Sequence, residues 1–306
     1  MSKVTEIINA YAKKITGHLG VGYKNLKSGE EFYLNGDVRF QAASVFKVPV
    51  LVELFNQLPE GAFSMDDMIK MNAEDVSLGS GILSALTPGV SLPLKDYALL
   101  MMIVSDNTAT DYIVNLLGKA KINATIQGMG LTNTTVDYTC EELIRATWNI
   151  PANVTRAEAV RMIMSGESAI NDAIFTDHSI KNNWTSPWDI TDIFSKIYHK
   201  EVVSPKACED MMDIMGKCAT NNRLPYLLPT MGADAVQKVI HKTGTLSKLT
   251  NDAGIIVSDK QAYILSIFYN GCNASPEERD ETPGVSFGER LLAELSRDVY
   301  IELHKN

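Results

Sequence analysis

The chain has 306 residues, of which 45% are hydrophobic and 21% charged, a balance typical of a soluble globular protein with one large domain or two lobes. Its formal net charge of −9 argues against nucleic-acid binding, because neutralising phosphates needs clustered lysine and arginine. The acidic balance also disfavours adhesion to an anionic membrane, and no apolar run approaches the ~20 residues that span a bilayer. We therefore expect a monomer that needs neither nucleic acid nor a membrane.

The amino-terminal segment predicts a helix followed by a hairpin. Apolar residues recur at helical spacing over residues 3–17. Two strand-like stretches, residues 19–26 and 30–36, follow and are joined by a turn-forming segment. No continuous apolar stretch follows the first basic residues, so we do not expect a secretory signal in this sequence. The compartment stays open, because a leader that had been removed would leave no trace.

Helical patterns dominate from about residue 44 to residue 218, several of them preceded by a serine, threonine or aspartate at the cap position. The strongest cover residues 93–105, 107–118, 155–166, 186–198 and 204–218. The pattern then changes to three predicted strands, residues 236–244, 251–259 and 261–271. Residues 285–304 predict an amphipathic terminal helix.

Strands therefore occur at both ends of the chain, with helices between them. One antiparallel sheet of about five strands, built from both ends and covered by the terminal helices, would bury these apolar stretches. We expect an α/β (α+β) fold with this sheet and a separate all-helical lobe. Residues 1–38 with 219–306 would form the mixed lobe, and residues 39–218 the helical one.

The cysteines and histidines give no indication of a metal site. No Cys-x-x-Cys spacing occurs, and no histidine stands at metal-ligand distance from a cysteine. We expect no cofactor, and buried free thiols at Cys140, Cys208, Cys218 and Cys272.

Ser44 and Lys47 lie three residues apart in the apolar run QAASVFKVPVLVELF. If a helix begins at or just before Ser44, both side chains share one face and the amine can contact the hydroxyl. A serine nucleophile needs a base, and lysine is one only where desolvation or nearby charge lowers its pKa. The apolar neighbours favour desolvation, while Pro49 removes a backbone donor and predicts an irregular helix start. An N-capping serine beside a snorkelling lysine is the structural alternative.

Two short motifs elsewhere in the chain favour the catalytic over the structural interpretation of Ser44 and Lys47. SDN, residues 105–107, lies where one helical pattern ends and the next begins, and KTG, residues 242–244, ends a predicted strand. SVFK, SDN and KTG in this order resemble the three motifs of the penicillin-recognising serine enzymes, which include class A β-lactamases and DD-peptidases. The resemblance extends from Phe40 to about Gly271 and implies the two-lobed fold of that family.

The resemblance implies catalytic roles for the first two motifs. Ser44 would be the acylated nucleophile, Lys47 its proton acceptor, and Ser105 the hydroxyl that passes a proton to the leaving nitrogen. Asn107 would hydrogen-bond the substrate amide. Asp106 is interpreted as structural, holding the turn between two helices.

The resemblance implies substrate-binding roles around the third motif. Lys242 and Thr243 would bind a substrate carboxylate, and Gly244 would let the strand backbone lie close to the ligand. Backbone N–H groups of Ser44 and Thr245 would form the oxyanion hole. The residues after KTG lack the glycine-rich turn and the arginine often found there in β-lactamases, so a preference for ordinary penicillins does not follow.

Turnover of the acyl-enzyme needs a base that activates water. ESAIN, which begins at Glu167, resembles the class A pattern Glu-x-x-Leu-Asn, with isoleucine in place of leucine. Glu167 lies further from Ser105 along the chain than that pattern usually allows. Glu141 or Glu142 could serve instead, or the base could be absent, and a solvent-facing loop glutamate is the plain structural interpretation of Glu167.

Three functions remain open from the sequence. The first is a β-lactamase that opens a small-molecule β-lactam amide and releases the acyl group to water. The second is a DD-peptidase or esterase acting on another small amide or ester, and the third is a penicillin-binding sensor that is acylated without turnover. A Ser-His-Asp hydrolase is disfavoured, because no GxSxG elbow occurs and strand alternation predicts that His241 points away from Lys242 as a packing or surface residue.

Overall fold

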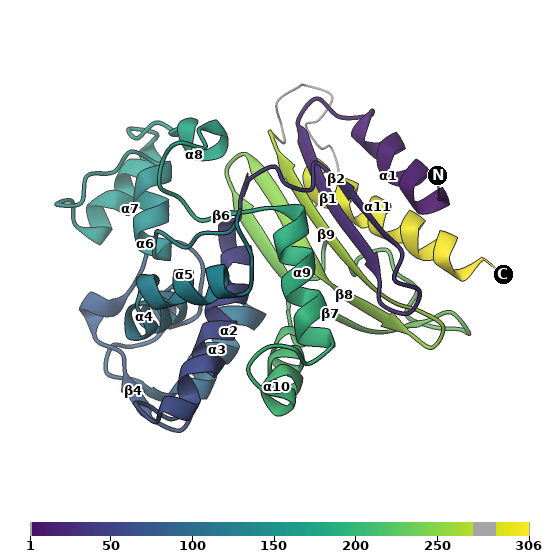
Figure 1. Ribbon diagram of the computed structural model, residues 1–306. Coiled ribbons are helices and arrows are strands. Elements are labelled where there is room, and N and C mark those ends of the chain that lie inside the picture. Colours follow the sequence, from purple (N-terminus) through teal and green to yellow (C-terminus); the bar gives the residue numbers. More distant parts are fainter. Residues whose placement is uncertain (1, 272–285, 306) are drawn as a thin grey trace. The chain divides into compact units, whose positions relative to one another are not determined.

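The computed structural model describes residues 2–271 and 286–305 (Figure 1). Its contacts divide the chain into two compact units: unit 1, residues 1–45 with 185–306, and unit 2, residues 46–184. The division into lobes at residues 38 and 218 stays a prediction, and these units differ from it because residues 185–218 belong to unit 1.

Unit 1 is built on a five-stranded antiparallel sheet with the strand order β2-β1-β9-β8-β7. Its strands are β1 (His18–Asn25), β2 (Glu31–Leu34), β7 (Val236–Leu246), β8 (Leu249–Ser258) and β9 (Ala262–Asn270). The central strand β9 is buried along its whole length, which explains its nearly continuous apolar sequence. The predicted sheet of about five strands, drawn from both ends of the chain, is confirmed.

Helices cover both faces of this sheet (Figure 1). The terminal helices α1 (Lys3–Ala12) and α11 (Phe287–His304) pack against each other and share a hydrophobic core with β1 and β9. On the other face α9 (Pro187–Tyr198) contacts β1, β8 and β9, and α10 (Pro205–Met215) packs on α9 and β7. The expected cover of the sheet by the terminal helices is therefore confirmed.

Along β1, small side chains face α9 and large ones face α1 and α11. A Cβ atom at Gly22 would lie 2.2 Å from Oγ1 of Thr191 and 2.7 Å from the carbonyl oxygen of Pro187, so glycine is needed for α9 to approach. The alternate residues Val21 and Tyr23 belong to the core beneath α1 and α11. The period-two alternation of the strand thus places small residues under α9 and large ones on the opposite face.

Unit 2 is mainly helical. Its central helix α2 (Lys47–Gln57) is almost entirely buried, because it contacts α3 (Leu94–Ile103), α4 (Asn107–Leu117) and α5 (Lys119–Gly128). The other helices are α6 (Cys140–Thr147), α7 (Arg156–Ser165) and α8 (Ala173–Thr176), and β4 (Met68–Lys70) pairs with β5 (Ser91–Pro93). Single 3-10 turns cover Leu58–Glu60, Ala73–Asp75 and Leu83–Ala85.

The remaining short elements lie near the two points where the chain passes between the units. They are β3 (Phe40–Gln41), the 3-10 helix Ala43–Phe46 and β6 (Trp184–Thr185). The 3-10 helix leads directly into α2, which confirms the expected irregular helix start. Pro49 explains it, because the proline has no N–H to donate to the residue one helical turn earlier.

The bounds of the first and last helices differ from the sequence prediction, and α10 ends three residues before the predicted residue 218. The first helix ends at Ala12 and not at residue 17, because the chain must turn before β1; a Cβ atom at Gly17 would lie 2.4 Å from the carbonyl oxygen of Asn270. The last helix begins at Phe287, after a capping box formed by Ser286 and Glu289. The predicted start at residue 285 lies outside the described residues. Within the described part of the chain, no helix has the length and apolar character needed to cross a membrane.

Candidate active site

Ser44 lies in the 3-10 helix Ala43–Phe46. The residue before it, Ala43, has a φ of 43°, a left-handed conformation that is uncommon outside glycine. Asn251 stabilises this turn, because its side-chain amide donates to the carbonyl oxygens of the two residues before Ala43, Gln41 at 2.9 Å and Ala42 at 3.2 Å. Ser44 is partly exposed although both its neighbours are buried. The turn therefore presents the serine to solvent from a fixed backbone.

The KTG motif lies on β7, and its three residues are buried. A Cβ atom at Gly244 would lie 2.6 Å from the carbonyl oxygen of Ala42 and 3.2 Å from the backbone nitrogen of Ser44. Only glycine allows this approach between the strand and the serine turn. Unit 1 therefore brings together two of the sequence-predicted segments, the serine turn and the KTG strand.

The other predicted residues of β7 differ in exposure. Lys242 is fully buried and its Nζ donates to the carbonyl oxygen of Thr243 at 2.9 Å. Thr245 is exposed, and its Oγ1 accepts a hydrogen bond from Nη2 of Arg223 at 2.5 Å.

Arg223 is a supporting residue that the sequence did not reveal. Its side chain is 2% exposed, and Nη1 donates to the carbonyl oxygens of Gly244 at 3.0 Å and Asn251 at 2.7 Å. Nη2 also forms an ion pair with Glu289 at 3.2 Å. The apolar stretch that begins at residue 224 indicates burial, but no sequence pattern names these partners. Arg223 therefore fixes the part of β7 that carries Gly244 and Thr245.

Lys47 is fully buried at the first position of α2. Its Nζ lies 2.8 Å from the carbonyl oxygen of Ser105, 3.1 Å from Oγ of Ser105 and 3.0 Å from Oδ1 of Asn107. None of these groups is charged. Desolvation lowers the pKa of Lys47, although nearby acidic groups act to raise it. A buried ammonium with no ion-pair partner is costly, so the site favours the neutral amine.

The hydrogen-bonding capacity of these partners also suits a neutral amine. The carbonyl oxygen of Ser105 can only accept. Oδ1 of Asn107 faces Lys47, because Nδ2 of the same amide donates to the carbonyl oxygen of Leu78 at 2.8 Å. A neutral amine can donate to these two oxygens and keep its lone pair for a hydroxyl hydrogen. Lys47 is thus desolvated, which is the condition for a lysine to act as a base.

The SDN turn is held in a strained conformation by Asp106. Ser105 has a φ of 57°, and Asp106 is fully buried as the N-cap of α4. Oδ1 of Asp106 accepts from the backbone nitrogen of Ala109 at 3.0 Å. Oδ2 accepts from the backbone nitrogens of Ile82 at 2.6 Å and Leu83 at 2.8 Å. These contacts agree with the structural interpretation of Asp106.

Cys140 is a neighbour of Lys47 that the sequence analysis missed. It begins α6, where the backbone N–H groups of Cys140 and the next residue donate to Asp111. Its thiol is buried and acts on the pKa of the Lys47 amine. Burial raises the pKa of this thiol, so it is protonated at neutral pH. The capping box of Thr139 and Glu142 predicts the helix start, but nothing in the sequence predicts the effect on Lys47.

Glu167 is not part of the Lys47 cluster. Its side chain is 51% exposed just after α7 and forms an ion pair with Arg161, which lowers the pKa of the carboxyl group. Among the described residues, its side-chain hydrogen bond comes from Arg161, and none reaches Lys47. Its role as the water-activating base stays a prediction.

The two alternative glutamates are also engaged elsewhere. Glu141 pairs with Arg145 at 2.7 Å and accepts from the backbone nitrogen of Leu78. Glu142 pairs with Lys119 at 2.7 Å. Neither carboxylate hydrogen-bonds to Lys47 within the described ranges.

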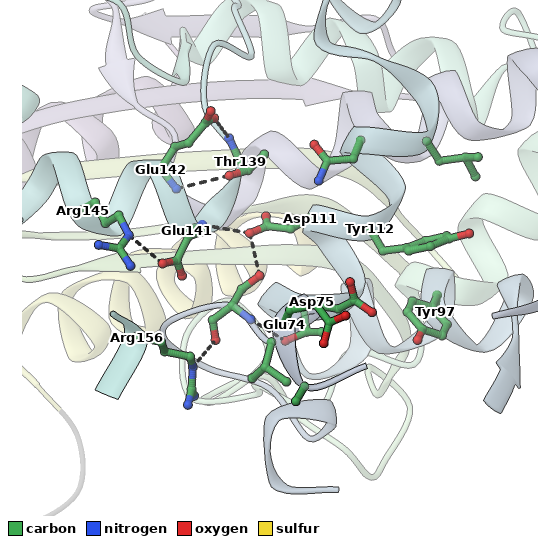
Figure 2. A pocket seen from close by; sticks show the side chains of 16 residues that line it. Glu74, Asp75, Tyr97, Asp111, Tyr112, Thr139, Glu141, Glu142, Arg145 and Arg156 are labelled. Atoms are coloured by element: carbon green, nitrogen blue, oxygen red, sulfur yellow. Dashed lines mark hydrogen bonds and ion pairs between the residues drawn. The ribbon is translucent and has the colours of Figure 1, made fainter. Parts of the chain in front are cut away.

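A cavity of about 780 Å³ lies in unit 2 around Asp111. Figure 2 shows Glu141 turned toward Arg145, and Asp111 accepting from the backbone nitrogen of Glu141. Its charged lining residues are Glu74, Asp75, Asp111, Glu141, Glu142, Arg145 and Arg156. Carboxylates outnumber guanidinium groups, so the cavity disfavours an anionic ligand such as a substrate carboxylate.

The remaining candidates concern metal sites and thiols. No cluster of three or more metal-ligating side chains occurs among the residues that the structure describes. Cys140, Cys208 and Cys218 are free and buried, as expected, whereas Cys272 lies outside the described residues. His241 is buried, with 1% of its surface exposed, and pairs with Asp252.

The sheet, the helical unit and the three motifs are those of the penicillin-recognising serine hydrolases. The model of the Beta-lactamase enzyme family matches residues 3–302, so the chain belongs to that family. This confirms the resemblance inferred from SVFK, SDN and KTG.

Individual relatives agree with the family assignment. The chain is 22% identical to the β-lactamase VEB-1 of Pseudomonas aeruginosa, over 93% of this chain and 85% of that protein. The structure of a β-lactamase from Sphaerobacter thermophilus matches with a TM-score of 0.76 at 22% identity, covering 98% of this chain and 96% of the other. The L158E mutant of PBP-A, an acyl-enzyme complex with penicillin G, matches with a TM-score of 0.76 at 26% identity, covering 99% and 96%.

Proposed function

We propose that this chain is a serine β-lactamase-like hydrolase that forms an acyl-enzyme at Ser44. Membership of the β-lactamase enzyme family supports this activity and a small-molecule β-lactam as substrate. The observation that carries the proposal is the buried Lys47. It follows Ser44 by three residues and is hydrogen-bonded to the SDN turn, with no carboxylate partner in the described chain.

The proposed reaction has two steps. Oγ of Ser44 attacks the carbonyl carbon of the amide and gives its proton to Lys47. The C–N bond breaks as Ser105 gives its proton to the leaving nitrogen and takes one from the Lys47 ammonium, and the acyl group remains as an ester on Ser44. Water then attacks the ester, a base takes the water proton, and the Ser44 hydroxyl is restored.

The binding roles follow from the KTG strand. The positive charge of Lys242 and the hydroxyl of Thr243 would hold the substrate carboxylate. The N–H groups of Ser44 and Thr245 would stabilise the oxyanion. Asn107 would bind the substrate amide through its side chain.

A Ser44→Ala variant tests the proposal. We expect it to lose covalent labelling by a fluorescent penicillin and to lose the mass adduct of the intact protein. Ser28→Ala, which changes an exposed serine in the β1–β2 turn, is the matched control and should label like the wild type. Undiminished labelling of Ser44→Ala would refute the assignment of the nucleophile.

A second candidate function is a penicillin-binding protein that is acylated but releases the acyl group very slowly. The exposed, arginine-paired Glu167 favours it, because an activating base must reach the ester. If Glu167 is the base, Glu167→Gln should accumulate the ester adduct while the wild type turns over nitrocefin. If the second function holds, the wild type itself shows a burst equal to the enzyme concentration, and Glu167→Gln does not change the lifetime of the adduct.

A further inference from the structure

The cavity of about 780 Å³ in unit 2, called here the unit 2 cavity, has no role in the proposed reaction. Its wall is formed by the 3-10 turn Ala73–Asp75 with the residues after it, by α3, α4 and the start of α6, and by the first residue of α7. Among the described residues, none of those assigned to acylation or substrate binding lines it. Its volume lies within the range of about 300–1,000 Å³ that is typical of small-molecule sites.

Tyr97, on α3, is a buried tyrosine on this wall whose hydroxyl has no partner in the protein. The residue is 2% exposed, and no group in the described part of the chain hydrogen-bonds to its hydroxyl. Its ring packs against that of Tyr112, with the ring centroids 5.2 Å apart (Figure 2). Buried polar groups are nearly always hydrogen-bonded, so an unpaired hydroxyl at the wall of a cavity is available to a ligand.

Glu74 and Asp75 add negative charge to the wall that carries the tyrosines. Glu74 has no hydrogen bond or ion pair within the described ranges. Oδ2 of Asp75 accepts from the backbone nitrogen of Asn72 at 2.7 Å and from its side-chain amide at 3.0 Å, both of which are neutral donors. Burial and the charge of Asp75 raise the pKa of Tyr97 to about 12, so its hydroxyl keeps its proton at neutral pH.

The basic side chains of the wall do not neutralise this charge. Glu141 and Glu142 already have basic partners. Arg156 is the remaining basic residue of the wall, and its Nε donates to the carbonyl oxygen of Ser77 at 3.4 Å. The two carboxylates of the 3-10 turn therefore exceed the one guanidinium, and the buried Asp111 adds to the excess when it is ionised. The cavity thus favours a cationic ligand.

The carboxylates are spread too widely for one metal ion. They come from the 3-10 turn, α4 and α6, and no three metal-ligating side chains converge among the residues that the structure describes. A divalent cation needs several oxygen atoms around one point. A diamine instead carries two positive charges at the ends of an apolar chain. Val76, Leu116 and the two tyrosine rings offer such a chain apolar surface along the same wall.

We propose that the unit 2 cavity is a binding site for a small alkyl diamine. One ammonium group pairs with Glu74 and Asp75 and donates to the hydroxyl of Tyr97. The methylene chain lies against the rings of Tyr97 and Tyr112, where the positive charge also gains from the aromatic faces. The second ammonium group is attracted by the carboxylates of α4 and α6.

The experiment is isothermal titration calorimetry of the full chain with 1,4-diaminobutane at neutral pH and low ionic strength, where charges are least screened. We expect saturable binding of one diamine per chain with a Kd of about 1 mM or tighter. Magnesium chloride in place of the diamine should give no saturable binding. Absence of saturable diamine binding would overturn the proposal, and so would magnesium binding in its place, which would indicate an inorganic cation site.

Tyr97→Phe tests the hydroxyl alone. Because this hydroxyl has no partner in the protein, its removal should leave the melting temperature almost unchanged and weaken diamine binding by about fivefold. Tyr263→Phe removes another buried, unpaired hydroxyl, in unit 1, and is the matched control. It should bind the diamine like the wild type. Equal affinities for the two variants would contradict the assignment of Tyr97.

Glu74→Gln tests the charge at an exposed position of the 3-10 turn. We expect diamine binding to weaken by about fivefold or more, because one carboxylate of the pair is lost. Glu201→Gln, at an exposed position in unit 1, changes the net charge of the chain equally and should not change the affinity. The same loss in both variants would mean that the diamine responds only to net charge, which would overturn the site. None of these measurements depends on penicillin labelling, so their failure would leave the acyl-enzyme proposal untouched.

Discussion

Nζ of Lys47 lies 3.0 Å from Oδ1 of Asn107, and both side chains are buried. The amine also donates to the carbonyl oxygen and hydroxyl of Ser105, and the protonated thiol of Cys140 acts on its pKa. Asp106 and Asp111 act on it from α4 without hydrogen-bonding to it. The protonation state of Lys47 is therefore governed by burial and not by an ion pair.

Cys140→Asp is predicted to shift the pH dependence of acylation. Lys47 acts as a base only when neutral, so the acylation rate rises as the pH rises through its pKa, and the lowered pKa places this rise at lower pH. A carboxylate at residue 140 would pair with the ammonium form and raise the pKa, moving the rise upward by about 1 to 3 pH units. The measurement is the second-order rate constant of fluorescent penicillin labelling from pH 5 to 10.

Cys140→Ser is the control for this shift, because it keeps a small neutral hydrogen-bonding group beside Lys47. Its pH profile should superimpose on that of the wild type. Identical profiles for the wild type and the folded Cys140→Asp variant would show that the residue at 140 does not influence the amine.

Gly244→Ala is predicted to disrupt the serine turn. Its Cβ would lie 2.6 Å from the carbonyl oxygen of Ala42, a backbone atom that cannot move without shifting Ser44. We expect a loss of about 2 kcal/mol or more in the free energy of unfolding and at least tenfold slower penicillin labelling. Gly128→Ala, at a helical glycine with open space around it, should be neutral or stabilising by up to about 1 kcal/mol. Similar effects at the two positions would contradict the steric argument.

The sequence predicted the sheet and the motifs because both depend on local patterns. Alternating or continuous apolar stretches mark β1, β8 and β9, and capping residues mark the helix starts. SVFK, SDN and KTG are short, and the resemblance to the penicillin-recognising enzymes required only their order. Features that depend on a few neighbouring residues could therefore be predicted from the sequence.

Contacts between distant segments could not be predicted from the sequence in the same way. Cys140 acts on the pKa of Lys47, and Arg223 donates to the carbonyl oxygen of Gly244, only because the fold brings those segments together. ESAIN matched a motif, but its glutamate is exposed and paired with Arg161. A local match therefore identified a residue type without its surroundings.

Arg223→Met is predicted to destabilise unit 1. Methionine fills much of the volume but donates no hydrogen bonds to Gly244 or Asn251, and it leaves Glu289 without its buried cation. We expect a loss of about 3 kcal/mol in the free energy of unfolding, measured by urea denaturation. Arg290→Met, which changes a half-exposed arginine next to Glu289 on α11, should cost less than about 0.5 kcal/mol. Equal losses would show that burial of the guanidinium is not what matters.

The His241–Asp252 pair is predicted to make stability fall with rising pH. The pKa of His241 is raised from 6.5 to about 10 in the folded chain. Its contribution is therefore complete below about pH 6.5, where the unfolded histidine is also protonated, and is lost progressively as the pH rises toward 10. Cys218, with a lowered pKa, would contribute in the opposite direction, so Cys218→Ser is the appropriate background.

In that background we expect the free energy of unfolding to fall by a few kcal/mol between pH 6.5 and 10, measured by urea denaturation at each pH. Adding His241→Gln should flatten this dependence, because glutamine does not titrate. Comparing the two chains at each pH also cancels the contributions of lysines and tyrosines elsewhere, which both chains share. Parallel curves for the two chains would mean that His241 is not protonated in the folded state and that its pair with Asp252 is not ionic.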